Sequence, residues 1–217
     1  MVIAVLALLA SIVLSNLGGA REGARVSNAL QFQSNMHSLL GSDLVGWWQF
    51  NEGSGTSAID SSGYGNVGEL YGGVSWEDGV PGTLGRSLEF DGAYGSLTRV
   101  QMANPSFFDI KGGLTVSAWV FPISEATTQG RTVLSKYRYY DAMPETGWNF
   151  GQVWTGNYFR FQLHSGGSTT NANFNGFFTT HLNRWSHVVG VYSPGQYVRL
   201  YIDGEMVSEA TASVIPE

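Results

Sequence analysis

The 217-residue sequence contains no cysteine and few charged residues, which make up 13% of the chain. Without cysteine, disulfides, thiolate catalysis and cysteine-based zinc sites are excluded. The 11 Lys and Arg residues against 17 Asp and Glu residues give a formal net charge of −6. Because a nucleic-acid-binding surface needs a basic patch that neutralises phosphates, we expect no nucleic-acid partner.

Sequence motifs of several enzyme classes are also missing. There is no Gly-x-Ser-x-Gly elbow and no glycine loop followed by Gly-Lys-Ser/Thr. Glu89 and Asp91 share one face of a short strand, as the acids of a glycosidase would. A third acid at close spacing is missing and Gly92 follows at once, so we interpret Asp91 as a turn residue. The sequence therefore predicts a protein that is not an enzyme.

The four histidines are spread over different predicted elements. His37 falls in a helical segment, His164 and His187 in strands, and His181 in a loop. A metal cluster is therefore not expected from them. We interpret His187 as a structural histidine beside an aromatic side chain.

No charge appears before Arg21, and residues 1–14 are apolar except for Ser11. This run is short for a membrane span, which needs about 20 apolar residues. Three interpretations remain: a secretory signal peptide ending near Gly18-Gly19-Ala20, a buried helix, or a membrane helix that lacks its first turns.

Residues 21–40 contain no proline, and apolar side chains recur there at spacings of three and four. The stripe comprises Val26, Ala29, Leu30, Gln33, Met36, Leu39 and Leu40. We predict one helix that runs from the apolar segment to about Leu40 and stops at Gly41.

The segment ALLASIVLSNLGGAREGARVSNALQFQSNM resembles the N-terminal helix of type IV pilins and pseudopilins, over about the first 40 residues. The resemblance implies packing against copies of the chain or other pilins, and residence in the membrane during assembly. The basic leader, the peptidase site and the nearby glutamate of that family are absent. We therefore expect the full-length protein to begin before Met1.

From Leu44 onward the apolar period changes to two, which predicts strands. The predicted strands are LVGWWQF (44–50), LTVSAWVF (114–121), YFRFQLH (158–164), SHVVGVY (186–192) and VRLYI (198–202). Asp78-Gly79, Asp91-Gly92 and Asp203-Gly204 supply turns, and the last has the form of a two-residue hairpin loop. We predict an antiparallel sandwich.

Four stretches, in this order, resemble laminin-G-like, concanavalin A-like jelly-roll modules: residues 47–66, 85–100, 114–122 and 184–207. The likeness covers residues 44–217. Because further strands follow the last hairpin in that family, we expect the sandwich to be truncated at its C-terminus. The predicted fold is α+β overall: a long N-terminal α-helix (residues 1–41), then an all-β antiparallel jelly-roll sandwich (residues 42–217).

Two candidate sites follow from side-chain chemistry. The glycine-rich loop from Asp60 to Asn66 carries hard oxygen donors, and Asp91 is a distant partner for them, which predicts a structural Ca²⁺ site. The alternative is a turn capped by the Asp60 side chain. Aromatic residues gather in the irregular stretch 136–157, where flat rings stack on sugars or roof the core. The predicted ligand contacts are Tyr139, Tyr140, Trp148 and Trp154.

We therefore expect a membrane-anchored, extracytoplasmic protein of the cell surface or a pilus. In this interpretation the helix assembles the protein and the sandwich binds a glycan or a surface protein. One alternative is a secreted lectin-like domain freed by signal-peptide cleavage. Another is a secreted glycan-active enzyme that uses Glu89 and Asp91.

Overall fold

The computed structural model describes residues 2–80, 85–92, 97–103, 108–109, 112–125, 130–140, 143–152 and 156–213. Within these ranges, side chains are described except at residues 2–18, 137–140 and 143–145. The pilin-like apolar run at residues 1–14 therefore lies outside the described side chains.

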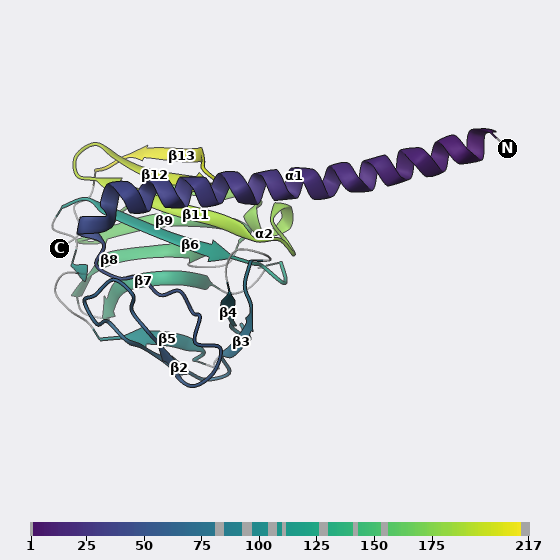
Figure 1. Cartoon of the computed structure of the whole chain (residues 1–217). Coiled ribbons are helices and arrows are strands. Elements are labelled where there is room, and N and C mark those ends of the chain that lie inside the picture. Colours follow the sequence, from purple (N-terminus) through teal and green to yellow (C-terminus); the bar gives the residue numbers. More distant parts are fainter. Residues whose placement is uncertain are drawn as a thin grey trace.

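One long helix precedes the strands, as the sequence predicts. Helix α1 spans Val2–Leu40 and is followed by a 3-10 turn, η1, at Gly41–Asp43. Its N-terminal half runs beyond the edge of the β-structure, and its C-terminal half lies along it (Figure 1). Among the described side chains, no helix is long and apolar enough to span a membrane, so the expected transmembrane helix finds no support there.

Two four-stranded antiparallel sheets make the sandwich. The helix-side sheet has the order β13-β12-β11-β6, with β6 at Leu114–Val120, β11 at Ser186–Ser193, β12 at Tyr197–Ile202 and β13 at Glu205–Thr211. The far sheet has the order β10-β9-β8-β7, with β7 at Arg131–Tyr140, β8 at Met143–Gln152, β9 at Tyr158–Ser165 and β10 at Ser168–Asn175.

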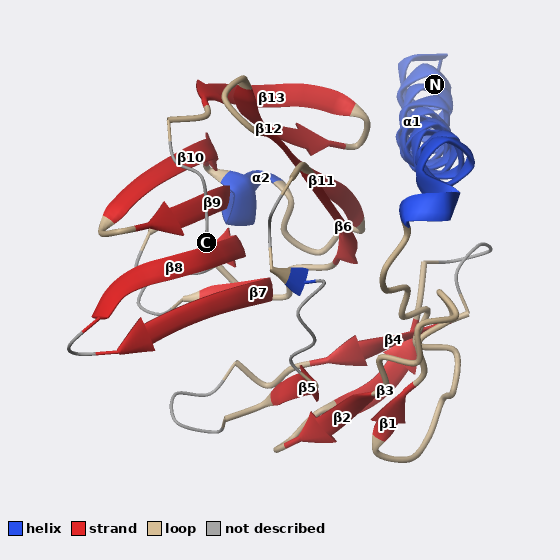
Figure 2. Ribbon diagram, turned by 90° about the vertical axis from the view of Figure 1, so that its left-hand side faces the viewer, coloured by secondary structure: helices blue, strands red, loops and turns tan. Residues whose placement is uncertain are grey.

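Smaller antiparallel pairings lie below the sandwich in Figure 2. Strands β1 (Ser57–Ala58), β2 (Gly68–Tyr71) and β5 (Arg99–Met102) form one sheet, and β3 (Ser75–Asp78) pairs with β4 (Arg86–Glu89). A short helix, α2 (Phe177–Thr180), follows β10. These pairings complete the antiparallel jelly-roll architecture that the sequence predicts.

The core lies between the two sheets and follows the alternation of the strands. In β6 the predicted face of Leu114, Val116, Ala118 and Val120 packs into this core. In β9, Phe159, Phe161 and Leu163 are at most 1% exposed. Gly190 of β11 lies opposite Phe161, and an added Cβ would meet the Phe161 Cγ at 2.7 Å. A glycine at this position therefore makes room for the Phe161 ring of the opposite sheet.

Helix α1 covers the opposite face of the helix-side sheet. His187 and Val189 alternate with the core residues of β11, yet both are 0% exposed. The layers therefore follow the order α1, helix-side sheet, far sheet, as Figure 2 shows with α1 seen end-on. The far sheet is thus left with one face that α1 does not touch.

Two expectations for strands are wrong. Residues 44–50 form no strand beyond a single bridge from Trp48 to Asp60, because Phe50 has a φ of 55° and Trp48 donates to the Asn66 carbonyl at 2.7 Å. The stretch 136–157, expected to be irregular, instead contributes to β7 and β8. Register shifts between Thr132 and Leu134 and between Arg138 and Tyr140 accommodate this hairpin.

Candidate functional site

The turn between β12 and β13 lies where α1 meets the sandwich, and it confirms the predicted Asp203-Gly204 hairpin. Both residues have positive φ, 53° and 86°, as a two-residue loop of this kind requires. Asp203 also pairs with β11. Its N–H donates to the His187 carbonyl at 2.8 Å, and its Oδ1 accepts from the His187 N–H at 2.9 Å.

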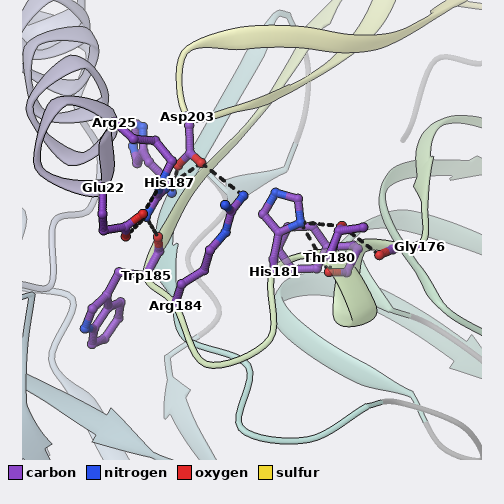
Figure 3. Close-up of polar contacts among 10 residues, drawn as sticks. Glu22, Arg25, Gly176, Thr180, His181, Arg184, Trp185, His187 and Asp203 are labelled. Carbon is purple, nitrogen blue, oxygen red and sulfur yellow. Dashed lines mark hydrogen bonds and ion pairs between the residues drawn. The ribbon is translucent and has the colours of Figure 1, made fainter. Parts of the chain in front are cut away.

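The second carboxylate oxygen of Asp203 holds α1 (Figure 3). The Arg25 Nη1 lies 2.5 Å from the Asp203 Oδ2, and Nη2 of the same guanidinium donates to the Trp185 carbonyl. Glu22, one turn earlier, accepts from Arg25 Nε at 2.9 Å. Arg184 contributes a longer ion pair to Asp203 at 3.9 Å. Opposite charges thus meet in a partly buried position where α1 meets the sandwich.

Aromatic contacts continue this docking along α1. The Phe32 ring stacks with Tyr201 at a centroid distance of 5.9 Å and meets His187 edge-on at 6.1 Å. One residue later, Gln33 accepts a hydrogen bond from the Trp119 Nε1 at 2.6 Å.

The docked face follows the predicted stripe except at its C-terminal end. Ala29 is 0% exposed and Val26, Leu30, Gln33 and Met36 are partly buried, but Leu39 is 80% exposed. An apolar groove of about 200 Å³ remains between the end of α1 and the sheet, lined by Phe32, Met36, Leu39, Leu40, Thr115, Val191 and Tyr201.

Two histidines on this side of the molecule are buried. The His187 Nε2 lies 2.8 Å from the Ser117 Oγ, and its ring packs near Trp119. Burial lowers the pKa of His187 to about 4, against an opposing effect of Asp203. His181 stacks on Phe177 at 4.4 Å, and burial, with Arg184 nearby, likewise lowers the pKa of His181 to about 4. These histidines are neutral structural groups at neutral pH.

Polar side chains occupy the outward face of the far sheet. The register places Ser135 opposite Asn149, Asn149 opposite Gln162, and Gln162 opposite Asn171. One row of hydrogen-bonding side chains therefore crosses all four strands. We call this the polar face, defined by Ser135, Asn149, Arg160, Gln162, His164 and Asn171.

The central members of the polar face are held closely. Asn149, Gln162 and His164 are 4%, 6% and 4% exposed. The Asn149 Nδ2 lies 3.2 Å from the His164 Nε2, which positions both side chains. The Gln162 Oε1 and the Arg160 Nε are buried without a hydrogen-bond partner among the described residues. Buried polar atoms of this kind are uncommon in native proteins and indicate a missing partner.

The polar face was not predicted, because the predicted ligand contacts were aromatic rings. The usable signal was the polar half of each alternating strand, such as Arg160, Gln162 and His164 in β9. Its importance emerges only when the register aligns these residues with Asn149 and Asn171.

The four predicted ligand contacts fare differently. Trp148 is 4% exposed and belongs to the core, so it offers no ring face to a ligand, which corrects the expectation for this residue. Its partner across the sheet is Leu163, which faces the core as well. Tyr139 and Tyr140 lie in β7, but their side chains are outside the described set, and Trp154 lies outside the described residues.

The Asp60 loop has the geometry of a capped turn. Asp60 Oδ1 accepts from the backbone N–H groups of Trp47 at 2.9 Å and Ser62 at 2.8 Å. Asp60 Oδ2 accepts from the Asn66 N–H at 2.9 Å and from its Nδ2 at 3.1 Å. Burial opposes ionisation, but these hydrogen bonds prevail and lower the pKa of Asp60 to about 2.

This arrangement brings Asp60 and Asn66 together, as predicted, but both carboxylate oxygens already face N–H donors. Donors directed at a carboxylate do not suit a cation, which needs those lone pairs. Asp91 instead accepts from the Thr98 Oγ1 at 2.8 Å. Among the described residues, no group of three His, Asp or Glu side chains is arranged to hold a metal ion. The Ca²⁺ site stays a prediction, and the described geometry does not favour it.

The candidate acid pair also takes the positions of a solvated turn. Strand β4 ends at Glu89, whose side chain is exposed, and Asp91 lies beyond the strand, followed by Gly92 with a φ of 61°. The two carboxylates therefore do not share a strand face.

Solved structures with a similar fold include three clostridial toxin domains. The binding domain of botulinum neurotoxin serotype C1 has a TM-score of 0.62 and 15% identity, over 81% of this chain and 40% of that one. A structure of botulinum neurotoxin type C, whose cell entry is described as dependent on two ganglioside molecules, has a TM-score of 0.59 and 15% identity. The match covers 82% of this chain and 41% of that one. The binding domain of botulinum neurotoxin DC in complex with rat synaptotagmin II has a TM-score of 0.57 and 16% identity, over 81% of this chain and 41% of that one.

This chain therefore spans about two fifths of the length of these neighbours. At such identities the likeness establishes the fold alone. Among curated proteins, none matches the chain. Residues 92–216, however, match a laminin G family described as the concanavalin A-like lectin/glucanases superfamily. Because the match spans more than half of the 217 residues and coincides with both sheets of the sandwich, the chain belongs to the concanavalin A-like lectin/glucanases superfamily.

Proposed function

We propose that this chain is a non-enzymatic, extracytoplasmic binding protein whose sandwich holds a saccharide on the polar face. The row Ser135, Asn149, Gln162 and Asn171 is the observation that carries the proposal. Amide and hydroxyl groups both donate and accept hydrogen bonds, so they match the hydroxyl groups of a sugar ring.

The chemistry of the polar face favours binding over cleavage. Glycoside hydrolysis uses two carboxyl groups on either side of the scissile bond. The described side chains of the polar face are amides, a hydroxyl, an imidazole and a guanidinium, without a carboxylate among them. Bound sugar would therefore meet hydrogen-bonding groups but no acid–base pair.

The similar structures lend support to a role in recognition. Their titles name rat synaptotagmin II for one neurotoxin binding domain and two ganglioside molecules for another neurotoxin. A saccharide or a surface protein as ligand is in keeping with those descriptions.

For α1 we propose a pilin-like role, in which the helix carries the sandwich in a filament or membrane. The support is the position of the apolar sequence. Residues 2–14 fall in the half of α1 that extends beyond the sandwich, whereas Arg25 and Phe32 dock the other half (Figure 1). A projecting apolar helix needs lipid or protein around it.

Binding is tested with the full chain on a panel of immobilised oligosaccharides. We expect the protein to bind at least one of them, and Asn171→Ala and Gln162→Leu each to weaken that binding about tenfold. Ser193→Ala, on the helix-side sheet, is the matched control and should bind normally. Failure to bind any oligosaccharide, or full binding by both polar-face variants, would overturn the proposal.

The role of the helix is tested by deleting residues 1–20. The truncated protein should stay folded and lose its association with membranes or with other copies, as measured by flotation and sedimentation. A truncated protein that still associates like the full chain would show that the apolar run is not the anchor.

A secreted lectin-like domain remains the second candidate, and one observation favours it. Every described contact between α1 and the sandwich involves Glu22 or a later residue, so a chain beginning at Arg21 would keep them all. N-terminal sequencing of the mature protein separates the candidates, because a start at Arg21 supports signal-peptide cleavage and retention of residues 1–20 supports the helix role.

A further inference from the structure

Arg160 in β9 is a cation without a described counter-charge. Its guanidinium lies over the Tyr158 ring at 3.9 Å. No ion pair or hydrogen bond to its side chain is described, and its Nε is buried without a partner among the described residues. The ring contact fixes the side chain in place, and the half-buried guanidinium has no described counter-charge.

Arg199 of β12 is the structural counterpart of Arg160 on the other sheet. It lies over Tyr197 at 3.7 Å, again two residues away on the same strand face. Its Nε, however, lies 2.5 Å from the Glu209 Oε2, and Glu209 is its cross-strand partner in β13. The same pair of residue types is therefore neutralised on one sheet and left positively charged on the other.

The neighbours of Arg160 explain the difference. Its cross-strand partners are Asn173 in β10 and Gly151 in β8, and neither carries a charge. Gly151 adds no side chain beside the guanidinium. Backbone atoms of Arg131 and Val133 in β7 lie where a Cβ of Gly151 would stand, so Asn173 is the polar cross-strand neighbour of Arg160.

The sequence of the far sheet has the same bias. Strands β7 to β10 contain Arg131, Lys136, Arg138 and Arg160 against one acidic residue, Glu145. The whole chain has a formal net charge of −6. Asp109 neutralises Lys136 at 2.5 Å, but Arg160 remains as a positive charge on the polar face of an acidic protein, which favours an anionic ligand there.

We propose, on the basis of the saccharide-binding function above, that the ligand is an acidic saccharide. Arg160 would bind its carboxylate or sulfate group, while Asn171 and the exposed Asn173, the cross-strand partner of Arg160, bind hydroxyl groups of the adjoining ring. A guanidinium presents paired donors to a planar or tetrahedral oxyanion, and such charge-assisted hydrogen bonds are stronger than neutral ones.

The test is calorimetric titration of the full chain with two matched pairs of oligosaccharides. One pair differs only in a terminal sialic acid, and the other only in a sulfate ester. We expect the acidic member of one pair to bind at least about tenfold more tightly than its neutral form, which corresponds to about 1.4 kcal/mol. The pair that shows this preference identifies the anionic group.

Arg160→Gln should remove the preference for the acidic form, whereas Arg199→Gln, the matched control, should keep it. The affinity of the unaltered protein for the acidic form should also fall as the salt concentration rises from about 0.05 to about 0.5 M, because salt screens the ion pair with Arg160. This second measurement does not depend on the variant folding normally.

The outcomes separate this inference from the function on which it rests. Equal binding of acidic and neutral forms, or an undiminished preference in Arg160→Gln, would overturn the acidic-ligand inference and leave saccharide binding intact. If none of the four oligosaccharides binds, the saccharide proposal and this inference both fail.

Discussion

At the scale of single residues, the Asp60 carboxylate shows how one side chain organises an irregular segment. Residues 44–66 contain little regular structure, and Asp60 supplies the acceptors that a strand ladder would otherwise provide to Trp47, Ser62 and Asn66. The alternating pattern of residues 44–50 predicts a strand because the sequence cannot show that a distant carboxylate competes for those N–H groups.

The pKa of Asp60 leads to a prediction about acid stability. Because its pKa falls from 3.8 to about 2 on folding, the stabilisation is present above pH 4 and is lost as pH falls to about 2. Asp60→Asn should reduce the free energy of unfolding at neutral pH by about 2 kcal/mol. Urea unfolding of both proteins from pH 7 to pH 2 measures this, and equal stabilities at pH 7 would contradict it.

His187 gives a prediction in a different pH window. Its folded pKa of about 4 lies below the ordinary value of 6.5, so the unfolded chain binds the extra proton between those values. Stability should therefore decrease as pH falls from 6.5 to 4, by about 3 kcal/mol for this group.

The check is thermal unfolding of the protein and of His187→Gln across this range. His181 titrates in the same window and remains in both proteins, so the variant should show a smaller, not an absent, loss. An identical pH dependence in the two proteins would mean that His187 is not the buried neutral group described.

Gly190 tests the close approach of the two sheets. Gly190→Ala places a methyl group 2.7 Å from the Phe161 ring, so repacking should cost about 1–3 kcal/mol of unfolding free energy. Gly112→Ala is the matched control, because an added Cβ there meets nothing within 4 Å. Chemical denaturation compares them, and equal stability of the two variants would contradict the described core.

At the scale of elements, α1 and the helix-side sheet form one packed unit. The sequence predicts the length of α1 and its end at Leu40, because periodicity and Gly41 are local signals. The predicted stripe also marks the docked side, because Ala29 is buried and Gln33 binds Trp119. It omits Arg25 and Phe32, whose partners Asp203 and Tyr201 lie more than 160 residues away.

Removing the Arg25 side chain should loosen this unit. Arg25→Ala leaves the partly buried Asp203 with a more distant cation, so we expect a loss of about 2 kcal/mol. Hydrogen exchange in residues 25–40 should rise, whereas exchange in β8 and β9 should not. Arg21→Ala, an exposed position on the same helix, is the control. Unchanged exchange in Arg25→Ala would show that aromatic packing alone holds α1.

The β7–β8 hairpin shows the opposite limit of prediction at this scale. Pro144 and Gly147 usually indicate irregular structure. Here both lie within β8, which pairs with β7 in a long hairpin with two register shifts. Because the register is set by partner strands, the row from Ser135 to Asn171 was not visible in the sequence. The strands with clean alternation, β6, β9, β11 and β12, were predicted within one or two residues of their ends.

At the scale of the whole molecule, the three layers separate two roles. Helix α1 covers one face of the helix-side sheet, and the far sheet lies beyond that sheet's other face (Figure 2). The register places the polar face on the side of the far sheet that points away from the core. A protein assembled through α1 would therefore keep that helix away from the polar face, where Ser135, Arg160 and Asn171 are less buried than Asn149, Gln162 and His164. The jelly-roll class was predictable from turn spacing and alternation, and the family match to residues 92–216 agrees with it.

The most direct measurement is an NMR titration of the full chain with the oligosaccharide that binds most tightly. The side-chain amides of Asn149, Gln162 and Asn171 report on the polar face itself. We expect their signals to shift on binding while the backbone signals of β12 and β13 do not. Shifts confined to the helix-side sheet, or no shift of the three amides at saturation, would contradict it.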